Sequence, residues 1–367
     1  MIILGLESSC DETAAAIIEV EDGGRLGDAR ILADTVWSQL EEHALYGGVV
    51  PELASRAHIR HIGAVLTETF KKGAIAPTQL DGVAVTQGPG LVGGLLVGLA
   101  VAKGIALAAD IPLVGVHHME GHLLSPFLAK TTAAPLDFPF VALLVSGGHT
   151  ILLHVRGLQD YVFLGQTRDD AVGEAFDKGA RLLGLGYPGG PAIEKAAGGG
   201  NRKAIPFPRI MLDKKRFDFS FSGLKTALKV QLQRQQGGEL PDHDRADVAA
   251  SYQEAIVDTL VFKAMAACHQ CRCGRLLVAG GVGANQRLRE RLAEEASGRI
   301  ALYFPPMALC TDNAAMIALA GWGRLQRQPG VHWETLDARA RWPIQEICRV
   351  EPSTMDPPFL SSRYWEC

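Results

Sequence analysis

The chain has 367 residues and a formal net charge of −4 at pH 7. That length predicts one large domain or two medium ones, and the charge excludes a generic polyanion-binding protein. An apolar fraction of 47% with 21% charged residues is typical of a soluble globular protein. A nucleic-acid role would need a local basic patch or a basic partner. The candidates are Lys214-Lys215-Arg216 and the series Arg287, Arg289 and Arg291, although each cluster alone is more typical of a solvated surface.

The seven cysteines are an odd number and form no disulfide-like framework. This usage is typical of a reducing compartment, so we expect a cytoplasmic protein. Cys268, Cys271 and Cys273 lie close together in the sequence, which leaves a metal or redox role open. Because no second Cys or His pair follows downstream, free thiols are the favoured interpretation.

Neither a signal peptide nor a membrane span is expected. The N-terminus lacks a basic segment before an apolar core, and Asp11 and Glu12 interrupt the first apolar stretch. The longest apolar stretch, residues 90–111, is divided by five glycines and Lys103. We therefore expect no contact with a membrane.

The chain opens with a predicted strand at 2–7, a short polar turn, and a second strand at 14–20. The same pattern returns at 140–148 and 149–155. Two such hairpins separated by helical segments indicate an internal duplication with two lobes that face each other.

Helical periodicity and glycine signals predict the remaining elements. Helices are expected at 55–73, 90–109, 169–185, 246–268, 282–296 and 310–326, and strands at 111–116 and 275–281. We expect an N-terminal lobe at 1–136, completed by a helix near 314–328, and a C-terminal lobe at 137–313. Residues 343–367 are expected to form a poorly ordered tail, because the chain becomes proline-rich and aperiodic after Arg341.

Glycine-rich turns follow several of these strands and present backbone N–H groups that can bind phosphate. The turns are SSCDET, LVSGGHT, YPGGP and LVAGGVGAN. Together with the duplicated hairpin they predict a nucleotide cleft between two lobes. The predicted fold is α/β, a two-lobed actin-like ATPase fold of the sugar kinase, Hsp70 and actin type with duplicated ribonuclease H-like lobes. The P-loop and dinucleotide-binding signatures are absent from the sequence.

The stretch HHMEGH carries the clearest metal-binding pattern. If it is helical, His118 and His122 share one face, and neutral imidazole suits zinc, iron, copper or nickel. An ordinary helix with two partly exposed histidines is about equally compatible with the pair alone. Asp312, in CTDN, is the most economical third ligand, and a helix N-cap is the alternative role for it.

Other polar residues stand at predicted turns. Asp11 and Glu12 lie in the first turn, where a general base or a metal would meet a phosphate, or where hydrogen bonds would shape the turn. Asp177 lies between apolar positions, so a ligand hydroxyl is a plausible partner. Asn285 follows a glycine turn and could cap a helix as easily as contact a ligand.

Nine separated motifs then agree with one family. They are ESSCDET, GGVVPELASRAH, GPGLVGGLLVG, HHMEGH, FPFVALLVSGGHT, GEAFDKGARLLGLGYPGGP, FSFSGLKTA, AGGVGANQRLR and CTDNAAMIA. Over about residues 1 to 343, the chain resembles the tRNA adenosine threonylcarbamoyltransferase family in its bacterial form (TsaD, formerly labelled the Gcp glycoprotease).

The resemblance implies transfer of a threonylcarbamoyl group from threonylcarbamoyl-adenylate to the exocyclic amine of the adenine next to the tRNA anticodon, with release of AMP. It implies one divalent metal ion, iron or zinc, held by His118, His122 and Asp312. Asp11 and Glu12 are the implied catalytic residues. The implied substrate-binding residues are Leu144, Val145, Ser146, Gly147, Gly148, Asp177, Gly190, Glu194 and Asn285.

The resemblance also implies partners. These are tRNA, an inactive paralogue subunit (TsaB-like) and a small ATPase (TsaE-like) that would use ATP and Mg. The cluster Cys268, Cys271 and Cys273 and the tail after Arg341 depart from the family pattern. Gly283 stands where a serine is common, which should barely affect binding because the backbone of the turn makes most of the contact.

Three other functions compete with this interpretation. A zinc metalloprotease (O-sialoglycoprotein endopeptidase) would need H-E-x-x-H, but Glu120 lies two places after His118, roughly 200° around a helix. An actin-fold small-molecule kinase would not need the histidine pair. A non-enzymatic scaffold would not need to retain the three ligands and every glycine turn.

Overall fold

The computed structural model describes residues 1–367 except 47, 130–134, 213–215, 235–241, 328–332 and 350–367. The chain divides into two compact units, Met1–Leu136 with Pro305–Ile347 and Asp137–Phe304 with Cys348–Cys367. Residues 305–313, which we expected in the C-terminal lobe, therefore belong to the first unit. The predicted cleft between the lobes stays a prediction.

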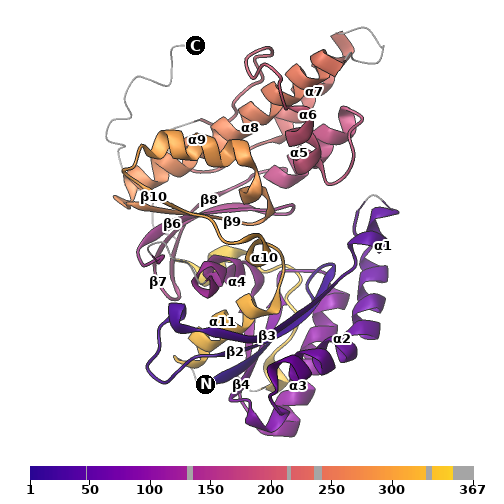
Figure 1. The fold of residues 1–367 in the computed structure, drawn as a ribbon, viewed down its shortest axis with the longest axis vertical. Helices are drawn as coiled ribbons and strands as arrows, with labels where there is room; N and C mark the ends of the chain where they lie inside the picture. The colour runs from indigo at the N-terminus through magenta and orange to yellow at the C-terminus, as the bar shows by residue number, and fades with distance from the viewer. Residues whose placement is uncertain (47, 130–134, 213–215, 235–241, 328–332, 350–367) are drawn as a thin grey trace. The chain divides into compact units, whose positions relative to one another are not determined.

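The first unit is built on a five-stranded mixed sheet in the order β3-β2-β1-β4-β5 (Figure 1). Its strands are β1 (Ile2–Glu7), β2 (Glu12–Glu19), β3 (Arg30–Ser38), β4 (Gly82–Gly88) and β5 (Leu113–His117). β1 pairs antiparallel with β2 and parallel with β4. The opening hairpin is confirmed, but Glu12 is the first residue of β2 and is not part of the turn.

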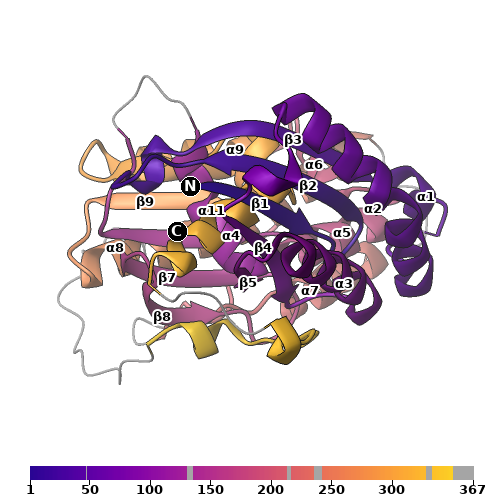
Figure 2. The same cartoon turned by 90° about the horizontal axis from the view of Figure 1, so that it is seen from below.

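Helices cover both faces of this sheet. They are α1 (Leu40–Ala44), α2 (Pro51–Gly73), α3 (Val92–Ala109), α4 (His118–Leu124), α10 (Met307–Cys310) and α11 (Ala314–Leu325). Leu4 and Leu6 share one buried cluster with residues of α2 and α3. The alternate residue Gly5 faces α11, where an added Cβ would lie 2.2 Å from Ala314 O, so glycine permits this close approach. Figure 2 shows α11 beside β1.

The second unit repeats the same sheet in the order β8-β7-β6-β9-β10. Its strands are β6 (Phe140–Val145), β7 (Thr150–Gly157), β8 (Asp160–Gln166), β9 (Arg275–Ala279) and β10 (Ala301–Tyr303). β6 pairs antiparallel with β7 and parallel with β9, as β1 does with β2 and β4. The duplication inferred from the two hairpins is thereby confirmed in strand order and direction.

The helices of the second unit are α5 (Val172–Leu182), α6 (Gly189–Ala196), α7 (Ser222–Arg234), α8 (Asp242–Gln270) and α9 (Gln286–Ala296). The long helix α8 packs on β6 and β9 and contacts α6 and α9. The chain re-enters the second unit at Cys348, and Arg349 forms an isolated parallel β-bridge with Val162 of β8. Most of the predicted tail, residues 350–367, lies outside the described residues.

Short 3-10 turns join these elements. They are Leu26–Asp28, Pro77–Gln79, Ser125–Leu128, Gly281–Ala284, Trp333–Thr335 and Ile344–Ile347. One described helix, α3, is long and apolar enough to cross a membrane by length and composition alone, and 33% of it is buried. A core helix of a globular protein passes the same test, so this finding is weak.

Candidate functional site

The predicted histidine pair lies on a short helix that begins directly after a buried strand. β5 ends at His117, whose Nδ1 accepts a hydrogen bond from Met119 N at 3.1 Å and so caps α4. His117 Nε2 donates to Trp342 O at 2.9 Å, which fixes the ring. His118 and His122 are both buried on the resulting helix. The helical prediction is confirmed, and the partly exposed alternative is wrong.

Close packing brings α4 to α11. An added Cβ on Gly121 would lie 2.9 Å from Ile317 Cδ1 and 3.0 Å from Met316 Cγ, so the glycine between the histidines lets the two helices approach. Asp312, which lies two residues before the start of α11, then reaches the histidine rings.

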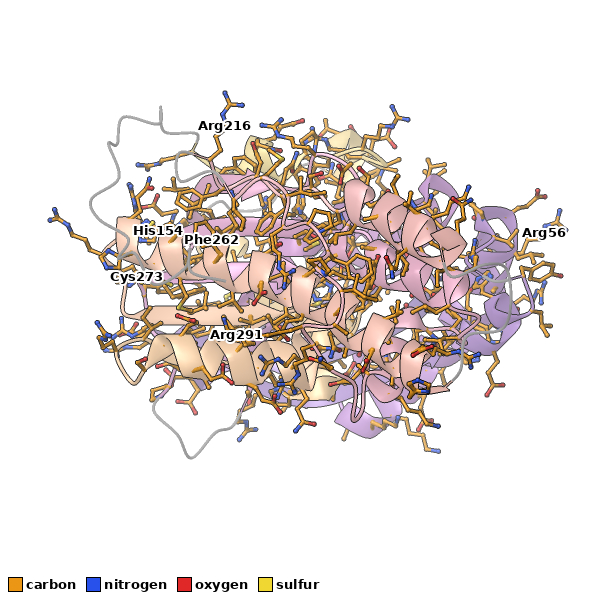
Figure 3. All side chains as sticks on the ribbon, turned by 90° about the horizontal axis from the view of Figure 1, so that it is seen from above. Arg56, His154, Arg216, Phe262, Cys273 and Arg291 are labelled. Carbon is orange, nitrogen blue, oxygen red and sulfur yellow. The ribbon has the colours of Figure 1, made fainter. Side chains whose placement is uncertain are left out.

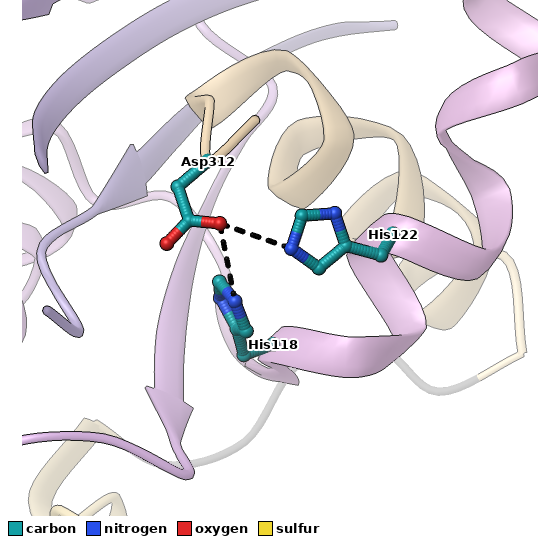
Figure 4. A group of neighbouring side chains, drawn as sticks. All are labelled: His118, His122 and Asp312. Carbon is teal, nitrogen blue, oxygen red and sulfur yellow. Dashed lines mark hydrogen bonds and ion pairs between the residues drawn. The ribbon is translucent and has the colours of Figure 1, made fainter. Parts of the chain in front are cut away.

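Asp312 is not the cap of α11. Asn313 has that role, because its Oδ1 accepts a hydrogen bond from Met316 N at 2.9 Å. Asp312 Oδ1 instead lies 3.0 Å from His122 Nε2 and 3.4 Å from His118 Nε2, as Figure 4 shows. The alternative role that the sequence left open for Asp312 belongs to its neighbour.

The three side chains have the separations that a metal ion requires. Their ligand atoms all lie within 4.8 Å of one another. Zinc-like ions bind nitrogen and carboxylate oxygen at about 2.0–2.2 Å, which for tetrahedral angles places ligand atoms roughly 3.4 Å apart. Two imidazole nitrogens and one carboxylate oxygen therefore fit a single divalent ion without rearrangement of the backbone.

Electrostatics favour a charged acid beside the histidines. Burial alone would raise the pKa of Asp312, but His118 and His122 hold that pKa well below its ordinary value. Burial would lower the pKa of His118, yet Asp312 and Glu7 raise it well above the ordinary value. Without an ion, a proton on His118 balances the acids, so cation binding there competes with protons.

Asp11 and Glu12 differ in their surroundings. Glu12 Oε1 accepts a hydrogen bond from Ser38 Oγ at 3.2 Å. Burial, followed by the charges of Asp11 and Asp312, raises the pKa of Glu12 to about 9. Glu12 therefore carries a proton at neutral pH.

Two buried side chains near this turn were missed by the sequence analysis. His58 of α2 donates from Nε2 to Cys10 O at 3.0 Å and receives Thr13 Oγ1 on Nδ1 at 2.8 Å, so it holds the segment that carries Asp11. Glu7 contacts His118. Both contacts join residues far apart in sequence, and spacing alone gives no signal for them.

The second unit contains a pocket of about 280 Å³ beneath its glycine turns. The lining residues are Gly147, Gly173, Phe176, Asp177, Tyr187, Pro188, Gly190, Pro191, Glu194, Gly281, Val282, Ala284 and Asn285. Five predicted residues are therefore brought together, namely Gly147, Asp177, Gly190, Glu194 and Asn285. Their neighbours Phe176 and Tyr187 were not predicted, although both lie within a quoted motif.

Hydrogen bonds fix the polar lining of this pocket. Asp177 Oδ1 accepts from Gly189 N at 2.7 Å, and burial raises the pKa of Asp177. Glu194 Oε1 accepts from Gln286 N at 2.6 Å. Asn285 is the N-cap of α9, with its Oδ1 2.9 Å from Leu288 N.

The side-chain amide nitrogen of Asn285 is also hydrogen-bonded. Its Nδ2 donates to Gln253 Oε1 at 2.9 Å. Asn285 therefore caps α9 and also lines the pocket, while its contact with a ligand stays a prediction.

The other predicted binding residues lie beside the pocket rather than in its lining. Leu144 and Val145 are buried in β6. Ser146 closes the β6–β7 turn, since its Oγ accepts from His149 N at 3.2 Å. Gly148 completes this turn, and an added Cβ there would meet nothing within 4 Å.

The basic series on α9 is largely occupied inside the unit. Arg287 binds Glu254 at 2.7 Å, and Arg291, labelled in Figure 3, binds Glu294 at 2.8 Å. Arg289 donates to Gly283 O at 2.8 Å, so it supports the pocket turn. In the other basic cluster, Lys214 and Lys215 lie outside the described residues.

Cysteines give no sign of a metal site. Cys268, Cys271 and Cys273 form no disulfide, and Cys273, labelled in Figure 3, donates to Pro139 O at 3.3 Å. Burial, followed by the two neighbouring thiols, raises the pKa of Cys268. Among the described residues, the only group of acids, histidines and cysteines that could hold an ion is His118, His122 and Asp312.

Comparison with known proteins decides the family. The family model described as tRNA N6-adenosine threonylcarbamoyltransferase (TsaD) matches residues 30–319. The chain belongs to this family. A relative of that name from Magnetococcus marinus is 58% identical over 352 residues, which cover 95% of this chain and 98% of the relative. Another from Methylibium petroleiphilum is 51% identical over 350 residues, covering 95% and 99%.

A solved structure agrees with the fold. Full-length HypF in its phosphate- and nucleotide-bound form superimposes with a TM-score of 0.58 at 13% identity, covering 90% of this chain and 47% of that one. The predicted actin-like ATPase fold is confirmed. The chain is a transferase of tRNA modification, and neither the protease nor the kinase interpretation is favoured.

Proposed function

We propose that the enzyme takes threonylcarbamoyl-adenylate as its donor and attaches the threonylcarbamoyl group to the exocyclic amine of the adenine next to the tRNA anticodon, releasing AMP. The observation that carries this proposal is the convergence of His118 Nε2 and His122 Nε2 on one oxygen of Asp312. Neither kinase nor scaffold function requires such a centre.

His118, His122 and Asp312 would hold one divalent ion, iron or zinc, since imidazole and carboxylate suit both. When bound, the ion supplies Lewis acidity toward a carbonyl oxygen and orients the group that carries it. The chain's own contribution is to fix the three donors in a buried site before any ion arrives. Glu120, the acid between the histidines, is bound by Arg324 at 2.6 Å.

The pocket of the second unit suits the adenylate portion of the donor. The exposed Tyr187 would pack against a purine, and the buried Phe176 adds an apolar side chain to the lining. Asp177 Oδ1 is held by Gly189 N, which leaves Oδ2 to accept a hydrogen bond from a ribose hydroxyl. Gly147 and Gly148 have open space where a side chain would stand, so their backbone amides can reach the leaving phosphate.

Asp11 and Glu12 would serve the incoming amine. The adenine amine is a poor nucleophile, so its positioning supplies much of the rate. We assign proton acceptance to Asp11. Glu12, with a pKa of about 9, keeps its proton at neutral pH and supports the turn through Ser38. This division avoids two adjacent negative charges.

Partners follow from the surface of the first unit. Large apolar side chains are exposed on α2 and α3: Ile59 at 66%, Val92 at 56%, Leu96 at 49% and Leu107 at 59%. Large exposed apolar side chains on two helices in contact are typical of a subunit interface. We assign it to a paralogue subunit of the TsaB type, with a small TsaE-like ATPase that uses ATP and Mg. The chain would act in the cytoplasm.

An assay on unmodified tRNA tests the proposal. The purified chain, with and without the two partners, is supplied with threonylcarbamoyl-adenylate, and modified nucleoside and AMP are quantified by mass spectrometry. We expect equimolar products with partners and little turnover without them. Asp312→Asn should abolish both products, whereas the exposed control Asp22→Asn should not. ATP turnover that requires no tRNA, with no modified nucleoside, would favour a kinase instead.

A further inference from the structure

Glu7 is a buried acid at the end of β1 with 1% of its surface exposed. Side chains alternate along a strand, so Glu7 points to the same face as Gly5, the face that packs on α11. A carboxylate in such a place is costly unless hydrogen bonds compensate for the lost water. Glu7 has three of them.

Each carboxylate oxygen of Glu7 has a defined role. Oε1 accepts a hydrogen bond from Ser9 N at 2.6 Å. Oε2 accepts one from Thr86 Oγ1 at 2.6 Å and lies 2.9 Å from His118 Nδ1. The ring nitrogen that faces Asp312 is the other one, Nε2.

We propose that Glu7 is a positioning residue of the metal centre. By accepting the Nδ1–H of His118, it keeps the lone pair of Nε2 directed at the ion and raises the basicity of that ligand. This inference rests on the proposed metal site of His118, His122 and Asp312.

The two histidines differ in this respect. His122 Nδ1 is buried and has no hydrogen-bond partner among the described residues. Only the His118 ring is therefore oriented by a carboxylate, and Glu7 controls one ligand of the centre and not the other. A merely structural Glu7 would hold the Ser9 turn and the Thr86 hydroxyl without affecting ion affinity.

Glu7→Gln tests this role because the backbone N–H of Ser9 determines the orientation of the new side-chain carboxamide. Ser9 N–H can only donate, so the carboxamide oxygen has to remain at the Oε1 position. The NH₂ group then occupies the Oε2 position, where it opposes the Nδ1–H of His118. Either the histidine loses its carboxylate acceptor and keeps only Ser9 Oγ, 3.3 Å from Nδ1, or the Ser9 amide loses its acceptor. Thr86→Val is the matched control, because it removes a donor to the same oxygen and leaves the carboxylate facing His118.

The experiment uses the full chain, stripped of metal by a chelator and titrated with Zn²⁺ alone against a competing indicator. We expect Glu7→Gln to bind zinc about 10–100-fold more weakly than wild type, the range for loss of such a support, and Thr86→Val to lose less than tenfold. Nitrogen-15 spectra of the zinc-loaded wild type should show a slowly exchanging Nδ1–H on His118, which Glu7→Gln loses.

The outcomes are separable. If wild type binds no zinc, the proposed metal centre itself fails. If wild type binds zinc and Glu7→Gln binds it equally well, the metal centre stands and the role of Glu7 is overturned. Should Glu7→Gln not fold, the wild-type spectrum decides, because zinc bound through Nδ1 of His118, or a rapidly exchanging Nδ1–H, would contradict the assignment.

Discussion

Arg324 donates two hydrogen bonds to Glu120 Oε2, from Nε at 2.9 Å and from Nη2 at 2.6 Å. Glu120 is the acid between the two histidines of α4, and this ion pair ties it to α11. A protease of the H-E-x-x-H type needs its glutamate at the metal as a general base. The pairing with Arg324 gives Glu120 a structural role instead.

Glu120→Gln should therefore lower stability and leave metal binding intact. Removing one partner of a buried ion pair strands the other, and because Arg324 keeps a quarter of its side chain exposed, we expect a loss of about 3 kcal/mol in the free energy of unfolding, the lower end of the usual range. Urea unfolding measures this loss. Glu52→Gln, in the exposed pair with Arg56, is the control and should cost less than about 0.5 kcal/mol. An equal cost for both variants would refute the structural role.

Glu12 should make the metal-free protein less stable as the pH rises. Its pKa in the folded state is about 9, above the ordinary value of 4.5, so the folded chain holds a proton that the unfolded chain has released. Its contribution to stability is complete below pH 4.5 and falls as pH rises toward about 9.

Glu12→Gln should remove that dependence. Unfolding at pH 5 and pH 8.5, with chelator present, should show the variant gaining stability over wild type at the higher pH. Glu19→Gln, at the other end of β2, is the control for a general charge effect. A constant difference between wild type and Glu12→Gln at both pH values would contradict the raised pKa.

Asp11→Asn tests the assignment of the proton acceptor. The amide keeps the shape and hydrogen bonding of the side chain but cannot accept a proton. We expect adenylate binding within a few-fold of wild type and a transfer rate at saturation roughly a hundredfold lower or worse, the usual scale for loss of a general base. Calorimetry and single-turnover kinetics separate the two quantities. Weaker binding with an unchanged saturated rate would make Asp11 a binding residue.

Gly190→Ala should weaken adenylate binding without unfolding the pocket. A Cβ added at Gly190 meets nothing within 4 Å, so it would extend into the space that the ligand needs. We expect binding to fall about tenfold, the equivalent of roughly 1.4 kcal/mol of steric cost. Gly186→Ala, also in open space but outside the pocket lining, should bind normally. Unchanged binding by Gly190→Ala would place the ligand elsewhere.

Local patterns predicted much of this molecule. The hairpins at β1–β2 and β6–β7, the glycine turns and the helical face of His118 and His122 depend on residues within a few positions of one another. Some strands were harder: β3, β8 and β10 were not predicted, because partly exposed or short strands lack a strong apolar run, and the buried strand β4 was missed as well. Pairing with a neighbouring strand defines such segments.

Site residues could be predicted from the sequence only where a residue type in its motif has few possible functions. His118, His122 and Asp312 were predicted from the spacing of the histidines and from family motifs, but the sequence could not tell that Asn313 would be the N-cap. Glu7 lies 111 residues from His118, and no spacing rule joins them. Contacts of this kind come from the topology of the sheet, which places the ends of β1 and β5 on either side of β4.

The measurement that tests the account most directly is metal content together with transfer activity in His118→Ala. The account predicts about one divalent ion per wild-type chain, and in the variant neither ion nor modified tRNA, with circular dichroism showing a folded protein. His269→Ala, an exposed histidine of α8, should match wild type in both respects. Full metal occupancy in folded His118→Ala would contradict the central claim.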